Sequence, residues 1–154
     1  MTEPVSVRVE WLELPTYVPG PDSPYPEYAW MARGERYPYS AKSDLSGEAR
    51  PARHRTVVLE NRYVRAVVLP DMGGRLYRLF DKTAGQDAFM VPPTVKFQNV
   101  AWRGAWLAGG IEFNYGYHHH TVNTVSPVTW AVRQEPDGSA AVWVGCAILP
   151  VESR

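Results

Sequence analysis

The residues best suited to chemistry gather in one span of the chain, residues 97–121 (FQNVAWRGAWLAGGIEFNYGYHHHT). An indole offers a flat apolar face together with an N–H donor, and carboxylates, guanidinium groups and imidazoles exchange hydrogen bonds with hydroxyl groups. A ligand that combines hydroxyls with flat apolar faces would use this mixture. The span therefore predicts a binding site for a carbohydrate. Its candidate residues are Trp102, Arg103, Trp106, Glu112, Asn114, His118, His119 and His120.

Three of these residues are candidates for acid or base catalysis. Glu112 follows two glycines, which let a backbone approach a ligand closely, and His118 and His119 can exchange protons near neutral pH. The alternative for Glu112 is a structural carboxylate paired with Arg103 or Arg75. Capping or surface positions are the alternative for each histidine. The sequence does not establish a reaction.

The remaining candidates would hold the ligand without reacting. We assign this role to Arg75, Trp102, Arg103, Trp106, Asn114 and His120. The planar fork of an arginine suits hydroxyl or carboxylate groups, although Arg75 could equally pair within a sheet. Tryptophan is mostly buried in any domain, so we expect one of Trp102 and Trp106 to line the site and the other to lie in the core. Trp130 and Trp143 are expected in the core.

The histidine run raises the question of a metal. Successive side chains of a strand point to opposite faces, so His118 and His120 would share one face and His119 would point to the other. A zinc site needs three or four ligands, and Glu112 and Cys146 complete no known zinc spacing. We therefore predict no metal and no cofactor, with a zinc protein as the alternative. Cys146 lies in an apolar strand and is expected to be a buried, unreactive thiol.

Length and charge narrow the classes of protein. The 154 residues fit one domain, and 16 basic residues balance 16 acidic ones. This balance argues against proteins that bind nucleic acid or anionic membranes through a strong positive field. The sequence contains no apolar run that could span a bilayer and no recognisable signal peptide. A single cysteine fits a reducing compartment, so we expect a cytoplasmic protein.

Composition and alternation predict an all-β fold, an antiparallel β-sandwich. Fourteen prolines disfavour long helices, while six Trp, nine Tyr and four Phe favour strands. Strands are predicted at 5–14, 56–60, 63–69, 75–80, 87–91, 125–132 and 140–149. Residues 15–51 form a proline- and tyrosine-rich irregular arm, with disorder as the alternative for 40–53. We divide the chain into 1–55 (first strand and arm) and 56–154 (the sandwich portion).

Residues 61–145 resemble a known group of domains. The run NRYVRAVVLPDMGGRLYRLFDKTAGQDAF is similar to the opening of the galactose mutarotase-like (aldose epimerase-like) β-supersandwich domains. The run WRGAWLAGGIEFNYGYHHHTVNTVSPVTWAVRQEPDGSAAVWVG is similar to an uncharacterised branch of that superfamily. Members of this branch commonly carry the domain ahead of tetratricopeptide (TPR) repeats.

The resemblance implies the N-terminal part of a domain that binds or processes a sugar. Aldose epimerases carry a histidine at the position of Leu107 or Ala108, and their base comes from later strands than those of this chain. The resemblance therefore implies carbohydrate binding more directly than mutarotation. The alternative is a non-catalytic β-module for protein interaction or oligomerisation. The expected partners are a carbohydrate, a second copy of the chain, or a C-terminal half or TPR region, with no nucleic acid and no membrane.

Overall fold

The structure is a computed structural model that describes residues 4–23, 35–36, 39–45, 47–100, 106–114, 120–147 and 152–153. All strand pairs in these residues are antiparallel, and the helical structure that they contain is a short 3₁₀ turn, η2 (Pro70–Met72). The predicted all-β, antiparallel fold class is confirmed.

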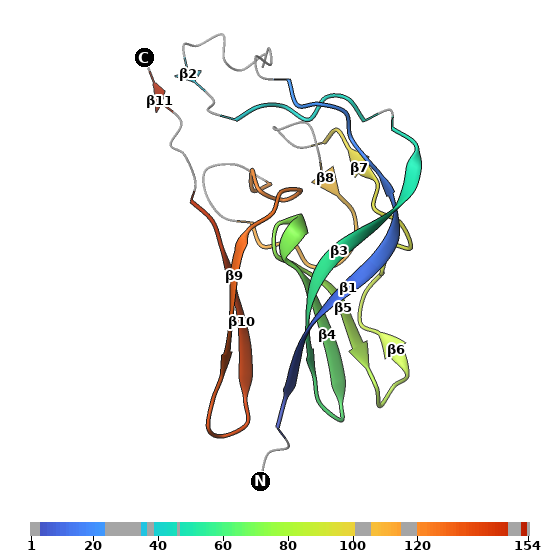
Figure 1. The fold of residues 1–154 in the computed structure, drawn as a ribbon, viewed down its shortest axis with the longest axis vertical. Helices are drawn as coiled ribbons and strands as arrows, with labels where there is room; N and C mark the ends of the chain where they lie inside the picture. The colour runs from blue at the N-terminus through green and yellow to red at the C-terminus, as the bar shows by residue number, and fades with distance from the viewer. Residues whose placement is uncertain are drawn as a thin grey trace.

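A five-stranded antiparallel sheet dominates the described part of the chain (Figure 1). Its strand order is β1-β3-β4-β5-β6, formed by β1 (Ser6–Tyr17), β3 (Ala49–Glu60), β4 (Val64–Leu69), β5 (Arg75–Asp81) and β6 (Gln86–Asp87). The two longest strands, β1 and β3, pair along their whole length, from Ser6 opposite Glu60 to Tyr17 opposite Ala49. β1 is therefore an edge strand of the sheet.

The predicted hairpin around residues 61–62 joins β3 to β4. The Asn61 side-chain Oδ1 accepts hydrogen bonds from the backbone N–H groups of Tyr63 and Val64, both at 2.9 Å. This local bridge replaces the glycine that a tight hairpin turn normally requires. The pairing of β4 with β5 shifts between Val67, which lies opposite Arg78, and Val68, which lies opposite Leu76. Tyr77 is the extra residue, so the bulge lies in β5 and bends that strand.

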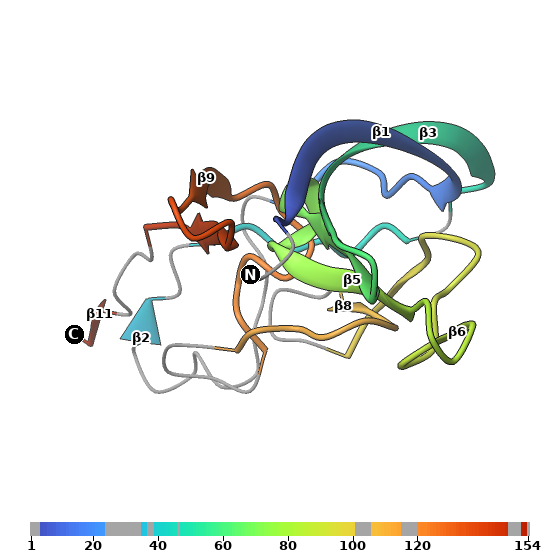
Figure 2. The ribbon, with the colours of Figure 1, turned by 90° about the horizontal axis from the view of Figure 1, so that it is seen from below.

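A second hairpin, β9 (Thr129–Gln134) and β10 (Ala140–Gly145), lies beside the large sheet in both views (Figures 1 and 2). Contact with the sheet occurs near the start of β5, where Val128 and Val144 lie against Gly74. Two further short pairs complete the described strands: β7 (Phe97–Gln98) with β8 (Trp106–Leu107), and β2 (Glu35–Arg36) with β11 (Glu152–Ser153).

The buried core lies between one face of the sheet and the segments that follow β6. It consists of Leu14, Val58, Val67, Leu69, Met72, Tyr77, Val95, Phe97, Leu107 and Val125. Burial of these side chains removes apolar surface from water, which is the main favourable term in folding. Tyr77 also satisfies its hydroxyl, which donates to Pro92 O at 2.6 Å.

The structure corrects several sequence predictions. β3 begins at Ala49, so the disorder considered for 40–53 is wrong for 49–53, and the predicted boundary at 55/56 falls inside a strand. The predicted core position of Trp143 is wrong: its side chain is 63% exposed, because it lies on the outer face of β10 opposite Ala131. Cys146 is half-buried rather than buried, and the Asn123 side-chain amide donates to its Sγ at 2.7 Å. Predicted strand 87–91 is reduced to the short β6.

Candidate functional site

Three predicted residues, Trp106, Glu112 and His120, form one cluster in the structure. The Trp106 indole Nε1–H donates to Glu112 Oε2 at 3.3 Å, and His120 Nδ1 lies 2.9 Å from the same oxygen. The Trp106 and His120 rings are in contact, with centroids 5.8 Å apart and planes inclined by 56°. An indole, an imidazole and a carboxylate therefore meet at a single oxygen atom.

The cluster is partly open to solvent. The side chain of Glu112 is 14% exposed and that of His120 is 30% exposed, while Trp106 is half-buried. Glu112 Oε1 has no hydrogen-bond partner among the described residues, although it is buried. When His120 donates through Nδ1 to Glu112, its Nε2 is left as an acceptor in the neutral ring. The arrangement can bind hydroxyl groups and can transfer a proton.

Two glycines shape the backbone that carries Glu112. Gly110 has a φ of 70°, in the left-handed region that favours glycine. A Cβ on this residue would lie 2.5 Å from Leu76 O. The close approach allows Ile111 to pair with Leu76 of β5 through two hydrogen bonds, Leu76 N to Ile111 O at 3.1 Å and Ile111 N to Leu76 O at 2.9 Å. The Gly-Gly pair thus attaches the Glu112 segment to the large sheet.

Arg75 supports this segment from inside the protein. It is 1% exposed, and its Nη1 donates to the carbonyl oxygens of Leu107 and Gly109, both at 2.8 Å. Its Nη2 donates to Thr124 Oγ1 at 3.2 Å. Burial lowers the pKa of Arg75, and the negative charge of Glu112 opposes this shift. Arg75 therefore joins strand β5 to the backbone between Trp106 and Glu112 and to Thr124, while direct contact with a ligand stays a prediction.

The side chain of Asn114 also forms a hydrogen bond within the chain. Its side-chain Oδ1 accepts a hydrogen bond from the backbone N–H of Thr121 at 3.0 Å. This bond ties together the two ends of the segment between Asn114 and His120. The amide NH₂ group of Asn114 is the part that a ligand could use. The predicted residues Trp102, Arg103, His118 and His119 lie outside the described residues.

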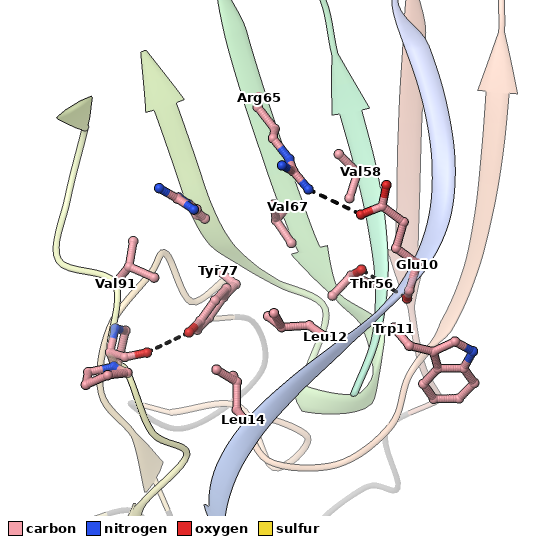
Figure 3. A pocket seen from close by; sticks show the side chains of 13 residues that line it. Glu10, Trp11, Leu12, Leu14, Thr56, Val58, Arg65, Val67, Tyr77 and Val91 are labelled. Atoms are coloured by element: carbon pink, nitrogen blue, oxygen red, sulfur yellow. Dashed lines mark hydrogen bonds and ion pairs between the residues drawn. The ribbon is translucent and has the colours of Figure 1, made fainter. Parts of the chain in front are cut away.

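A separate hollow of about 260 Å³ lies on the core-facing side of the large sheet (Figure 3). Its apolar walls include Leu12, Leu14 and Val67, and Arg65 at its rim donates to Glu10 at 3.2 Å. None of the predicted site residues that the structure describes lines this hollow. No sequence pattern indicated this hollow, because its walls come from four strands and from residues 91–93.

His54 is a buried polar residue that no sequence pattern indicated. It is 5% exposed, and its Nε2 lies 2.8 Å from Thr16 Oγ1. The Thr16 hydroxyl donates to Leu14 O at 3.0 Å, so the His54 Nε2 carries the hydrogen in this contact. Burial lowers the pKa of His54, and the carboxylate of Asp71 opposes the shift. The contact locks β1 to β3 and lies apart from the cluster.

The described residues contain no group of three or more His, Cys, Asp or Glu side chains placed to hold a metal ion. His118 and His119 lie outside these residues. Within the same described ranges, no helix has the length and apolar character needed to cross a membrane.

The fold and the cluster define an all-β protein with a partly open polar and aromatic site. Residues 32–153 match the family model described as "Domain of unknown function (DUF5107)". The match covers most of the chain, and the chain belongs to this family.

A solved structure is also similar to the chain. It is the crystal structure of a TPR-domain containing protein from Parabacteroides distasonis ATCC 8503, with 28% sequence identity and a TM-score of 0.75. The similarity covers 89% of this chain and 23% of that protein. The chain therefore matches a minor part of its neighbour's length. The similarity to a protein with TPR repeats agrees with the predicted branch of domains associated with such repeats.

Proposed function

We propose that the chain is part of a carbohydrate-binding domain of the galactose mutarotase-like kind, with its sugar site at Trp106, Glu112 and His120. One observation carries the proposal: an indole and an imidazole contact the same carboxylate oxygen in a partly exposed position. The resemblance of residues 61–145 to mutarotase-like domains supports it independently. The ligand class is a neutral sugar, because the chain has no excess of either charge.

Each group of the cluster has a role in this proposal. The Trp106 ring stacks on the apolar face of a pyranose, Glu112 accepts hydrogen bonds from sugar hydroxyls, and His120 uses its Nε2. Arg75 is a positioning residue, since its Nη1 holds the backbone between Trp106 and Glu112. If the intact domain performs chemistry, Glu112 with His118 or His119 supplies the acid and base, as in ring opening of an aldose.

A screen of monosaccharides by ligand-detected NMR tests the proposal. The Glu112→Gln variant keeps the size of the side chain and removes the charge, and we expect at least about a tenfold loss of affinity for any sugar that binds. Glu48→Gln makes the same chemical change at an exposed position and serves as the control. His119→Ala tests the predicted acid or base in the same screen. Binding that is equal in wild type, Glu112→Gln and Glu48→Gln would remove the proposed site.

The alternative function is a protein-interaction or oligomerisation module. The exposure of Trp143, which stands on the outer face of β10 opposite Ala131, favours it. Large exposed aromatic side chains on a flat strand pair are typical of surfaces that bind other proteins. Light scattering coupled to size-exclusion chromatography tests self-association, with Trp143→Ser as the variant. A wild-type monomer over a wide concentration range would count against oligomerisation.

A further inference from the structure

The outer edge of β1 carries backbone groups that face away from the sheet. Three contacts show which backbone N–H and C=O groups of this part of the chain face outward. Val5 N–H donates to Gly138 O at 2.8 Å, Tyr17 N–H donates to Val95 O at 2.8 Å, and Val95 N–H donates to Pro15 O at 2.9 Å. Because backbone groups alternate along an antiparallel strand, the N–H and C=O groups of the odd-numbered residues of β1 face its outer edge. The N–H and C=O groups of the even-numbered residues face β3.

Four residues between these contacts form what we call the β1 edge: Val7, Val9, Trp11 and Glu13. Among the described residues, their outward backbone groups have no hydrogen-bond partner. Contact with Gly138 limits this edge at one end, and the contact with Val95 limits it at the other. An unpaired edge of this kind pairs readily with another extended chain. The two limits leave room for a strand of about seven residues.

The side chains on the β1 edge indicate the chemistry of such a partner. Val9 is 53% exposed and Trp11 is 52% exposed, and Trp11 points away from the hollow on the other face of β1 (Figure 3). The guanidinium groups of Arg53 and Arg55 lie 5.1 and 5.4 Å from the Trp11 ring centroid. Neither arginine has an ion pair within the described part of the chain. Together they present two positive charges beside an exposed indole.

We propose that the β1 edge binds a short, extended, acidic segment of a partner protein, which adds to the sheet as an antiparallel strand. This inference is independent of the sugar site. In antiparallel pairing, directly opposite residues exchange both hydrogen bonds and place their side chains on the same face. The partner residue opposite Trp11 therefore bonds to β1 through its own N–H and directs its side chain toward Arg53 and Arg55. An acidic side chain fits this position.

A second copy of the chain fits the edge less well. The segment between Val5 and Pro15 is centred on Glu10, so symmetric pairing of two β1 edges would place two Glu10 carboxylates directly opposite each other. The partner's residues beyond Glu13 would also run into the position of Gly138, which is already bonded to Val5. A short segment of another protein avoids both conflicts.

Labelled seven-residue peptides test the proposal by fluorescence anisotropy on the whole chain. The probe Ac-TTETVTV-NH₂ places its glutamate opposite Trp11, with valines opposite Val9 and Val7. We expect binding to this probe and about tenfold weaker binding when lysine replaces its glutamate. N-methylation of the first, third, fifth and seventh residues should abolish binding, since these residues donate to β1. N-methylation of the second, fourth and sixth residues should leave binding intact.

The Val9→Pro variant tests the edge from the protein side. The Val9 N–H points outward, so proline removes a donor from the edge without removing a β1–β3 hydrogen bond, and proline is tolerated on edge strands. We expect an unchanged circular dichroism spectrum and no binding of the probe. If the variant fails to fold, the binding of the two N-methylated peptides to the wild-type protein still tests the proposal. Equal binding of both N-methylated peptides, or no binding of the unmodified probe, overturns the proposal. A wild-type dimer that Val9→Pro dissociates overturns it in favour of a second copy.

Discussion

Replacement of Arg75 by methionine tests how the structure holds its candidate site. Methionine keeps the length and much of the volume of the arginine side chain but provides no donor. Two carbonyl oxygens, those of Leu107 and Gly109, would lose their bonds to Nη1, and Thr124 Oγ1 would lose its bond to Nη2. The change therefore affects the backbone between Trp106 and Glu112 and the segment that follows His120 at once.

The expected loss follows from these contacts. A buried acceptor left without a donor costs about 1–3 kcal/mol, and the two carbonyl oxygens together give a loss of about 2–6 kcal/mol. The loss of the positive charge beside Glu112 lowers the stability further. The variant no longer buries a charged guanidinium, and this raises its stability. We expect a net loss of about 3 kcal/mol in unfolding free energy. For a chain of this size, that loss lowers Tm by roughly 6–12 °C.

The assay is thermal unfolding followed by circular dichroism, with urea unfolding as a second measurement. Arg78→Met is the matched control, because Arg78 is the same residue type on the same strand, and its side chain is 39% exposed. It pairs with Asp87 at 2.6 Å, and exposed ion pairs contribute about 1 kcal/mol or less. Equal losses in the two variants, or a gain in stability for Arg75→Met, would refute the supporting role of Arg75.

Three further predictions concern single residues. Burial lowers the pKa of His54 in the folded protein below 6.5, so the unfolded chain binds a proton more readily, and the wild-type protein should lose stability as pH falls below 6.5 toward the folded-state pKa. His54→Gln keeps an N–H donor for the Thr16 hydroxyl but has no group that titrates in this range. The variant should lose less over the same range in pH-dependent urea titrations. Gly110→Ala should destabilise the chain more than Gly85→Ala, since both glycines have positive φ but only Gly110 lies against Leu76 O; equal Tm values would contradict this. Asn61→Ala removes the acceptor of two hairpin N–H groups and should cost about 1 kcal/mol, measured by thermal unfolding.

All predicted strands except 87–91 are present in large part, but alternation alone did not identify their buried face. In β1, Val9 and Trp11 lie on one face and Leu12 and Leu14 on the other, so both faces carry apolar residues. Tertiary contacts decide which face is buried: Leu14 packs into the core, while Val9 and Trp11 are about half exposed. The same reason explains the exposure of Trp143. The alternation in β10 is regular, but no described residue covers the face of β10 on which Trp143 lies.

Part of the candidate site could also be predicted from residue types. The predicted gathering of Trp106, Glu112 and His120 rests on their closeness in the sequence and on the two glycines between them, and the structure brings these three together. The burial of Arg75 could not be predicted in this way. Its partners at Leu107 and Gly109 are more than thirty residues away in the sequence, and a charged residue is expected at the surface unless such contacts are known.

The most direct measurement is the indole N–H signal of Trp106 in ¹⁵N-correlated NMR spectra, assigned by comparison with Trp106→Phe. Titration with a sugar found in the screen should shift this signal in a saturable manner, because the indole N–H lies beside Glu112 Oε2. The signal of Trp143, on the outer face of β10, should stay in place. A sugar that binds without moving the Trp106 signal, or that moves both signals equally, would contradict a saccharide site at this cluster.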